Sequence, residues 1–147
     1  MNAHRTAGGV LKGICLTLAV FCGPIALGAD WPGWGGPNRD FKVAECKIAD
    51  SWPDEGPKTL WSRPLGKGYS AIAAVDGHLY TMTRRGDDEV IVSLNAKTGE
   101  TDWEYKYAAP VPEGMETRFG NGPNATPLVH GGKVYTIGVG GRLHCLR

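Results

Sequence analysis

Apolar and polar residues alternate in two matching passages of the chain, residues 70–81 and 125–136. Each passage has a short apolar stretch, then the pair Asp76-Gly77 or Gly131-Gly132, then a stretch that reads apolar-Tyr-Thr. Alternation with a period of two is typical of strands, and these pairs tolerate the positive φ angles of a two-residue hairpin turn. The pattern therefore predicts one β-hairpin in each copy of an internal repeat.

A third strand is expected to follow in each copy. Residues 90–94 of the first copy match residues 141–146 of the second. The turn before this strand is predicted at residues 85–88 in the first copy and at Gly140-Gly141 in the second, a difference of three residues.

Two tryptophans indicate a fourth, outer strand. Trp61 begins Trp-Ser-Arg-Pro-Leu, and Trp103 begins Trp-Glu-Tyr-Lys-Tyr 42 residues later. Four short strands in a period of about 40–50 residues are typical of a propeller blade. The second copy is delayed by 13 extra residues around 108–124, rich in Gly and Pro. We expect an ordered surface insertion there, where repeat proteins place binding contacts.

The predicted fold class is all-β, with four-stranded antiparallel blades of a β-propeller, represented by about its first two. The expected organisation is a signal peptide at 1–29, an irregular lead-in at 30–57 that wraps the first blade, and incomplete propeller repeats at 58–147. Six alternating apolar residues are expected to build the core between the sheets: Ile72, Ala74, Leu79, Ile91, Val134 and Ile137.

A turn before the outer strand carries the residues most specific to this repeat. Asn95 can accept hydrogen bonds from backbone groups, Thr98 can cap the same turn, and Gly99 suits a left-handed position. Trp103 follows with a large flat side chain that can lie across a neighbouring blade. Together with Trp61, these residues are the predicted structural motif.

The N-terminus has the layout of a secretory signal. Arg5 and Lys12 precede an apolar run at 14–22, and small residues lead to Ala29 without any acidic residue. We expect export to the periplasm or medium and no stable membrane span in the mature chain, because the run is shorter than the ~20 residues that a span needs. An uncleaved anchor is the alternative.

Composition narrows the function classes. The chain has 22 glycines and ten prolines in 147 residues and a net charge of +1. This composition favours short strands with tight turns, excludes a coiled coil or a multi-pass membrane protein, and gives no sign of a nucleic-acid partner. Export makes a disulfide between Cys46 and Cys145 chemically possible, but we favour two separate thiols, with Cys145 packed in a strand.

No residue is a convincing catalytic or metal candidate. His78, His130 and His144 fall on separate strands or turns, whereas metal sites need converging ligands. The acidic run Asp87-Asp88-Glu89 is expected to be a solvated hairpin turn rather than a calcium site. We therefore predict no catalytic, cofactor-binding or metal-ligating residue in this chain.

The motifs resemble a known family. The pattern Asn95-Ala96-Lys97-Thr98-Gly99-x-x-x-Trp103 looks like the tryptophan-docking motif of the PQQ-like (pyrroloquinoline quinone) β-propeller repeat family, which more often has Asp at the first position. Residues 31–40, Trp-Pro-Gly-Trp-Gly-Gly-Pro-Asn-Arg-Asp, resemble the opening of exported bacterial members, among them relatives similar to the outer-membrane assembly lipoprotein. The resemblance covers nearly all of residues 30–147.

The resemblance implies one of two functions. One branch of the family scaffolds or binds partners without catalysis. The other oxidises alcohols or sugars with pyrroloquinoline quinone and Ca²⁺, using an adjacent Cys-Cys pair and a catalytic Asp that have no match here. We expect an exported, non-enzymatic scaffold that engages protein or glycan partners through its loops. The alternatives are the N-terminal part of a quinoprotein dehydrogenase and, less favoured, a repeat domain attached to an exported enzyme or kinase.

The second copy of the repeat reaches Leu146-Arg147 without its turn and outer strand. Propellers close with about four to eight blades, so we expect the chain to be the N-terminal part of a longer propeller. The alternative is a short protein that assembles a ring from several chains.

Overall fold

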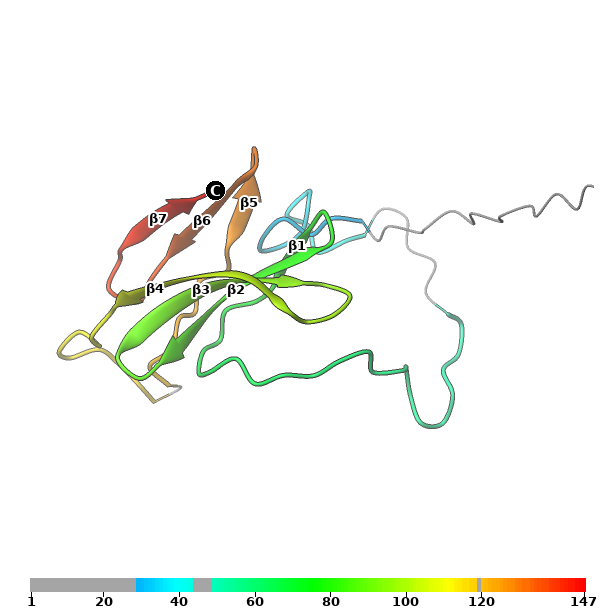
Figure 1. Cartoon of the computed structure of the whole chain (residues 1–147), viewed down its shortest axis with the longest axis horizontal. Coiled ribbons are helices and arrows are strands. Elements are labelled where there is room, and N and C mark those ends of the chain that lie inside the picture. Colours follow the sequence, from blue (N-terminus) through cyan, green and yellow to red (C-terminus); the bar gives the residue numbers. More distant parts are fainter. Residues whose placement is uncertain (1–28, 44–48, 119) are drawn as a thin grey trace, which may run out of the picture.

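The computed structural model describes residues 29–43, 49–118 and 120–147, which form two antiparallel sheets (Figure 1). The first sheet has the strand order β1-β2-β3-β4, and the second has the order β5-β6-β7. The strands are β1 (Ala73–Val75), β2 (His78–Arg85), β3 (Asp88–Asn95), β4 (Thr101–Ala108), β5 (Leu128–His130), β6 (Lys133–Ile137) and β7 (Leu143–Leu146). The predicted all-β class is confirmed, and the two sheets are consistent with propeller blades.

The first hairpin of each sheet has the predicted turn. Val75 pairs with His78 and His130 pairs with Lys133, so each loop has two residues. All four loop residues have positive φ angles, 51° and 77° at Asp76 and Gly77, and 57° and 68° at Gly131 and Gly132. Positive φ at both central residues is the type I′ geometry, which matches the twist of the strands it joins.

The second hairpin differs between the sheets. Gly86 and Asp87 join β2 to β3, with Gly86 at φ 63°. The two-residue turn predicted at Gly140-Gly141 is wrong: the loop has three residues, closed by Gly138 N–H donating to the Arg142 carbonyl at 2.9 Å. Gly141 at φ 78° occupies the left-handed position of such a three-residue loop.

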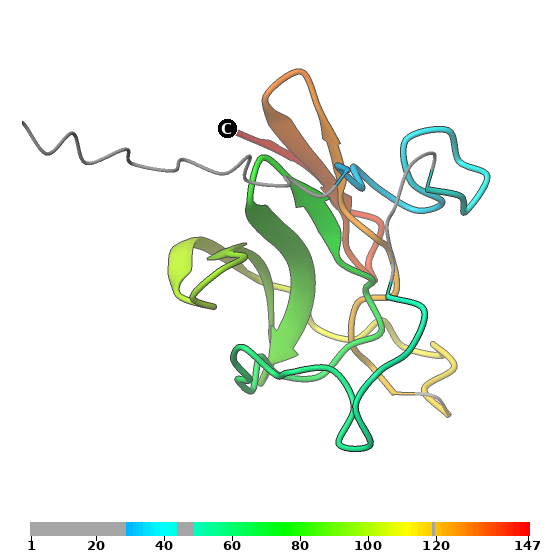
Figure 2. The ribbon, with the colours of Figure 1, turned by 90° about the vertical axis from the view of Figure 1, so that its right-hand side faces the viewer.

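Strand β3 lies between β2 and β4, and its side chains are buried on both faces of the first sheet. Ile91 faces the second sheet, in a cluster with Met82, Tyr107 and Ala109 that Leu146 also contacts. Val92 and Leu94, on the opposite face, are equally buried. The main core therefore lies between the two sheets, which Figure 2 shows from the side.

The predicted core is correct only in part. Ile91 and Val134 are buried, and Ala74 and Leu79 are half-buried, but Ile72 and Ile137 are exposed. Ala73 is the fully buried residue of β1, and its register with Tyr80 places it on the face of the first sheet that carries Met82 and Ile91. Ile137 points to the face of the second sheet that turns away from the first, and no described strand covers that face.

The lead-in closes the inner edges of both sheets. Trp31 exchanges two backbone hydrogen bonds with Ala74 of β1, at 2.6 and 2.9 Å. The next residue, Pro32, accepts a hydrogen bond from Val129 N–H of β5 at 2.7 Å. The segment therefore joins the innermost strands, and Figure 1 shows it in blue beside β1.

Two further expectations concern residues outside the described ranges. The predicted signal at 1–29 lies there except for Ala29, and so does Cys46. Cys145 lies in β7 but is exposed, not packed, and carries a free thiol in the described chain. Among the residues with described structure, no helix is long and apolar enough to cross a membrane.

Candidate functional site

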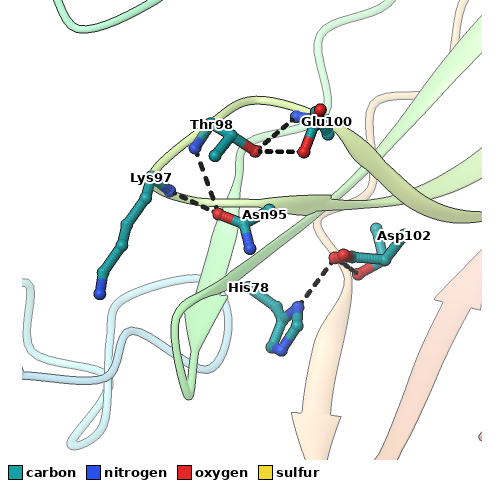
Figure 3. Close-up of polar contacts among 7 residues, drawn as sticks. His78, Asn95, Lys97, Thr98, Glu100 and Asp102 are labelled. Carbon is teal, nitrogen blue, oxygen red and sulfur yellow. Dashed lines mark hydrogen bonds and ion pairs between the residues drawn. The ribbon is translucent and has the colours of Figure 1, made fainter.

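The turn between β3 and β4 is a closed hydrogen-bonded unit (Figure 3). The Asn95 side-chain oxygen accepts hydrogen bonds from Lys97 N–H at 2.9 Å and Thr98 N–H at 3.2 Å. The Thr98 hydroxyl oxygen accepts a hydrogen bond from Glu100 N–H at 3.2 Å. Asn95 and Thr98 therefore stabilise the backbone of a tight turn through their side-chain oxygens, the role for which these residue types are suited.

Trp61 lies on this turn. Its indole Nε1 donates to the Ala96 carbonyl at 3.0 Å, and a Cβ built on Gly99 would lie 2.6 Å from the indole ring. Arg63, two residues later, donates to the Gly99 carbonyl at 2.6 Å. Residues 61–63, about 35 positions before this turn in the sequence, are thereby attached to the first sheet by an aromatic ring and two hydrogen bonds. We call Trp61, Arg63 and residues 95–100 the docking corner.

Trp103 lies elsewhere. It is half-buried on β4, packs against the Met82 and Ile91 cluster, and faces the second sheet. Its ring lines a hollow of about 430 Å³ together with Val134, Gly132 and Arg147. The structure thus brings Asn95, Thr98, Gly99 and Trp61 together. Trp103 is not part of this group: it faces the second sheet, whereas Trp61 packs on the first sheet.

Replacing Gly99 by alanine should destabilise the docking corner. The residue has φ 73°, which costs an L side chain about 1–2 kcal/mol, and the new methyl group would also collide with Trp61. We expect a loss of about 2–4 kcal/mol in chemical denaturation. The control is Gly86→Ala, which has φ 63° but no atom within 4 Å of the new Cβ. Equal losses in both variants would show that contact with Trp61 is unimportant.

A buried polar cluster was missed by the sequence reasoning. Glu89 was expected in a solvated acidic turn, but it is fully buried, whereas Asp87 is exposed. The Tyr107 hydroxyl donates to Glu89 Oε2 at 2.5 Å, and Val139 N–H donates to Glu89 Oε1 at 3.1 Å. Arg84 Nη2 lies 3.6 Å from the same Oε1. The carboxylate therefore joins the first sheet to the β6–β7 loop of the second.

Arg84 extends this cluster to the insertion. Its Nε donates to the Asn121 carbonyl at 2.6 Å, and its Nη1 donates to the Ala109 carbonyl at 2.8 Å. The side chain is 2% exposed, and Nη2 has no hydrogen-bond partner among the described residues. Burial and the Glu89 carboxylate both raise the pKa of Tyr107, so its hydroxyl stays a donor. The one sequence signal for an Arg84–Glu89 ion pair was their spacing: they lie on either side of a tight turn, so the two strands place them opposite each other.

His144 lies next to this cluster. Its ring centroid is 4.2 Å from that of Tyr107, and its Nδ1 is buried without a hydrogen-bond partner in the described chain. Burial lowers the pKa of His144, the nearby Arg142 lowers it further, and Glu89 opposes both effects.

The stability of the chain should therefore fall as the pH falls through the histidine range. The folded state binds a proton at His144 less readily than the unfolded state, so the loss begins near the ordinary pKa of about 6.5. Urea unfolding at pH 7.5 and 5.5 measures this change. In His144→Phe the change should be smaller, because the ring packing stays and the titrating nitrogen is gone. His130→Gln, an exposed site, is the control, and an unchanged pH dependence in His144→Phe would contradict the expectation.

One end of the molecule is formed by loops. This loop end comprises residues 66–69, the β2–β3 turn, the described residues of the insertion around 108–124 (all but 119) and the β6–β7 loop. It has a hollow of about 280 Å³ between residues 66–69 and 120–122, lined by glycine backbone, Lys67, Tyr69 and Asn121. A Cβ on Gly122 would lie 2.5 Å from Gly68, so the two segments are in backbone contact. Tyr69 is 63% exposed at the edge of this hollow.

The titratable side chains that commonly bind metals are dispersed over the described part of the chain. No group of three or more His, Cys, Asp or Glu side chains converges there. His78 is paired instead with Asp102, 2.8 Å from Nδ1 to Oδ2 (Figure 3). We assign no residue of this chain to calcium or to a quinone.

Comparison with known proteins places these features in a family. Residues 69–147 match the protein-family description "outer membrane protein assembly factor BamB", a PQQ-repeat domain. The matched region begins at Tyr69 and includes both sheets. Searches of curated proteins and of solved structures gave no match.

Proposed function

Because the chain belongs to the BamB-like PQQ-repeat family, we propose that it is an exported, non-catalytic propeller domain that binds protein or glycan partners through its loop end. The family shows the repeat and its fold but no ligand, so the partner class must be argued from the site.

The observation that carries the proposal is the exposed Tyr69 beside the hollow between residues 66–69 and 120–122. A tyrosine offers a rigid, flat and amphipathic face, which suits both a sugar ring and a protein surface. Tyr69 N–H donates to the Pro123 carbonyl at 2.8 Å, so the backbone that carries the ring is attached to the insertion. A binding residue held in this way loses little conformational entropy when a partner binds.

The polar chemistry near this end supports a structural role. Glu89, the buried carboxylate of the described chain, receives hydrogen bonds on both oxygens and has the Arg84 guanidinium beside it. A general base would need a free oxygen within reach of a substrate. Glu89 instead joins β3 to the second sheet, while Arg84 holds the insertion in place.

Export remains part of the proposal and rests on the N-terminal signal pattern of residues 1–29. A partner would then be met in the periplasm or outside the cell. Fractionation of cells that produce the full chain tests this: the processed chain should appear in the periplasm or medium, and an unprocessed cytosolic chain would contradict it.

Photo-crosslinking in cells tests the loop-end proposal directly. A photoreactive phenylalanine analogue at Tyr69 should capture a discrete partner, whereas the same analogue at His130, near the opposite end, should not. For glycans, we expect Tyr69→Ala to weaken array binding by about tenfold, the loss of one aromatic contact. No capture at Tyr69 together with no array signal, or equal capture at both positions, would overturn the proposal.

The alternative, a quinoprotein dehydrogenase segment, makes a different prediction. Pyrroloquinoline quinone with Ca²⁺ should raise the thermal midpoint of a chain that binds them. We expect no shift under saturating conditions, and a reproducible increase would favour the alternative.

A further inference from the structure

We propose that the hollow between residues 66–69 and 120–122 binds an acidic sugar unit of a glycan, with Tyr69 packing against the sugar ring and Lys67 binding its carboxylate. This inference rests on the proposed function and narrows it, because it names one partner class, a glycan that contains uronic acid, for the loop end.

Both walls of the hollow are attached to one buried residue, Arg84. Its backbone N–H donates to the Lys67 carbonyl at 2.6 Å, and Lys67 N–H donates to the Arg84 carbonyl at 3.0 Å. The Arg84 side chain reaches the other wall, where Nε donates to the Asn121 carbonyl at 2.6 Å. The two walls are therefore held in place before a ligand enters, and binding costs little conformational entropy.

Tyr69 borders the hollow and keeps an open ring surface. A Cβ built on Gly120 would lie 3.0 Å from Tyr69 Cε2, so the glycine backbone lies against one edge of the ring. The side chain is nevertheless 63% exposed. The C–H face of a sugar ring is apolar and its rim is polar, which matches the apolar body and polar hydroxyl of a tyrosine.

Three polar side chains around the hollow are available to a ligand. They belong to Lys67 and Tyr69, which are exposed, and to Asn121, which is half-buried. None of the three side chains forms a hydrogen bond or an ion pair with another residue of the described ranges. An ammonium, a phenol and an amide supply donors and acceptors that suit the hydroxyl groups and a carboxylate of a sugar.

The charge of the hollow favours an anionic ligand. Lys67 is the one charged residue that lines it in the part of the chain with described structure. The positive charge of Arg84 is balanced by Glu89, 3.6 Å away. The acidic residues of the insertion, Glu113 and Glu116, do not line the hollow. A ligand carboxylate would thus gain a charge-assisted hydrogen bond from Lys67.

A sugar fits this site better than an extended peptide does. A peptide that added a strand here would need free backbone groups in residues 66–69. Lys67 uses its N–H and its carbonyl toward Arg84, and Tyr69 N–H donates to the Pro123 carbonyl at 2.8 Å. The volume of about 280 Å³ lies at the lower end of ligand pockets, about 300 Å³, and suits a ring-sized unit.

A glycan array probed with the full chain tests the preference for an acidic sugar. The array should carry oligosaccharides of galacturonate, glucuronate and mannuronate beside their neutral hexose counterparts. We expect tighter binding of the acidic members, and this binding should weaken as salt is added, because an exposed ammonium–carboxylate pair is screened. Equal or tighter binding of the neutral members would overturn the proposal.

Lys67→Gln tests which residue binds the carboxylate. The side chain is exposed and the backbone bonds to Arg84 are kept, so the variant should fold. We expect its affinity for the acidic oligosaccharide to fall about tenfold, the loss of one charge-assisted hydrogen bond, with little change for a neutral member that binds. The matched control is Lys97→Gln, an exposed lysine in the turn at the other end of β3. No loss in Lys67→Gln, or an equal loss in the control, would overturn the proposal.

These outcomes separate the acidic sugar from the wider proposal for the loop end. If no sugar binds but crosslinking at Tyr69 captures a protein, the acidic-sugar proposal is wrong and the loop end still has a partner. If neither a sugar nor a protein is found, both proposals are wrong.

Discussion

Replacing Glu89 by alanine is expected to lower the free energy of unfolding by about 3–5 kcal/mol, the usual cost of removing one partner of a buried ion pair. Arg84 would keep its charge in a site where its side chain is 2% exposed. The Tyr107 hydroxyl and the Val139 N–H would each lose an acceptor. Because Val139 belongs to the second sheet, the variant should also loosen the contact between the two sheets.

Chemical denaturation followed by circular dichroism measures this loss. The matched control is Glu104→Ala, which removes the carboxylate of an exposed pair with Arg85, 2.7 Å apart, and should cost about 1 kcal/mol or less. In Arg84→Met/Glu89→Leu, both charges are gone, so part of the loss should be recovered. A Glu89→Ala loss as small as that of the control would contradict the structural role given to this cluster.

Trp103→Ala should have the second large effect, about 3 kcal/mol, near the lower end of the cost of removing a buried tryptophan. The ring is half-buried and packs on the cluster between the sheets, which Leu146 of the second sheet also contacts. Its loss would enlarge the neighbouring hollow of about 430 Å³, and the surrounding strands cannot collapse into that space without breaking their ladders.

A matched tryptophan makes this experiment specific. Trp52 is 56% exposed in the lead-in, so Trp52→Ala should change stability by about 0.5 kcal/mol or less. A loss below about 1 kcal/mol for Trp103→Ala would show that this ring does not stabilise the contact between the sheets.

The sequence predicted the hairpins well because their signals are local. The pairs Asp76-Gly77 and Gly131-Gly132 adopt the positive φ angles that their residue types tolerate. The Gly140-Gly141 prediction failed because several glycines stand close together there, and the local sequence then allows more than one loop. Gly138 is in close contact with Glu89 and Tyr107 of the other sheet, a packing contact that no local pattern contains.

The docking corner was also only partly predictable from the sequence. Asn95, Thr98 and Gly99 were identified from their spacing, and their contacts within the turn could be foreseen. The side chain that packs on this turn could not be foreseen, since Trp61 lies 35 positions before Ala96 in the sequence. Arg84 and Glu89 were not found at all, because charged residues beside a Gly-Asp turn are usually solvated, and only the packing of the second sheet buries them.

The sequence by itself determined the all-β class, the repeat and the first hairpin turn of each sheet, because these depend on residue period and on backbone freedom at a few positions. Tertiary structure alone decided which face of each strand is buried, what the tryptophans contact, and that Glu89 joins the two sheets. These properties depend on which distant segments meet, and a strand exposed by its own pattern becomes buried once another sheet packs against it.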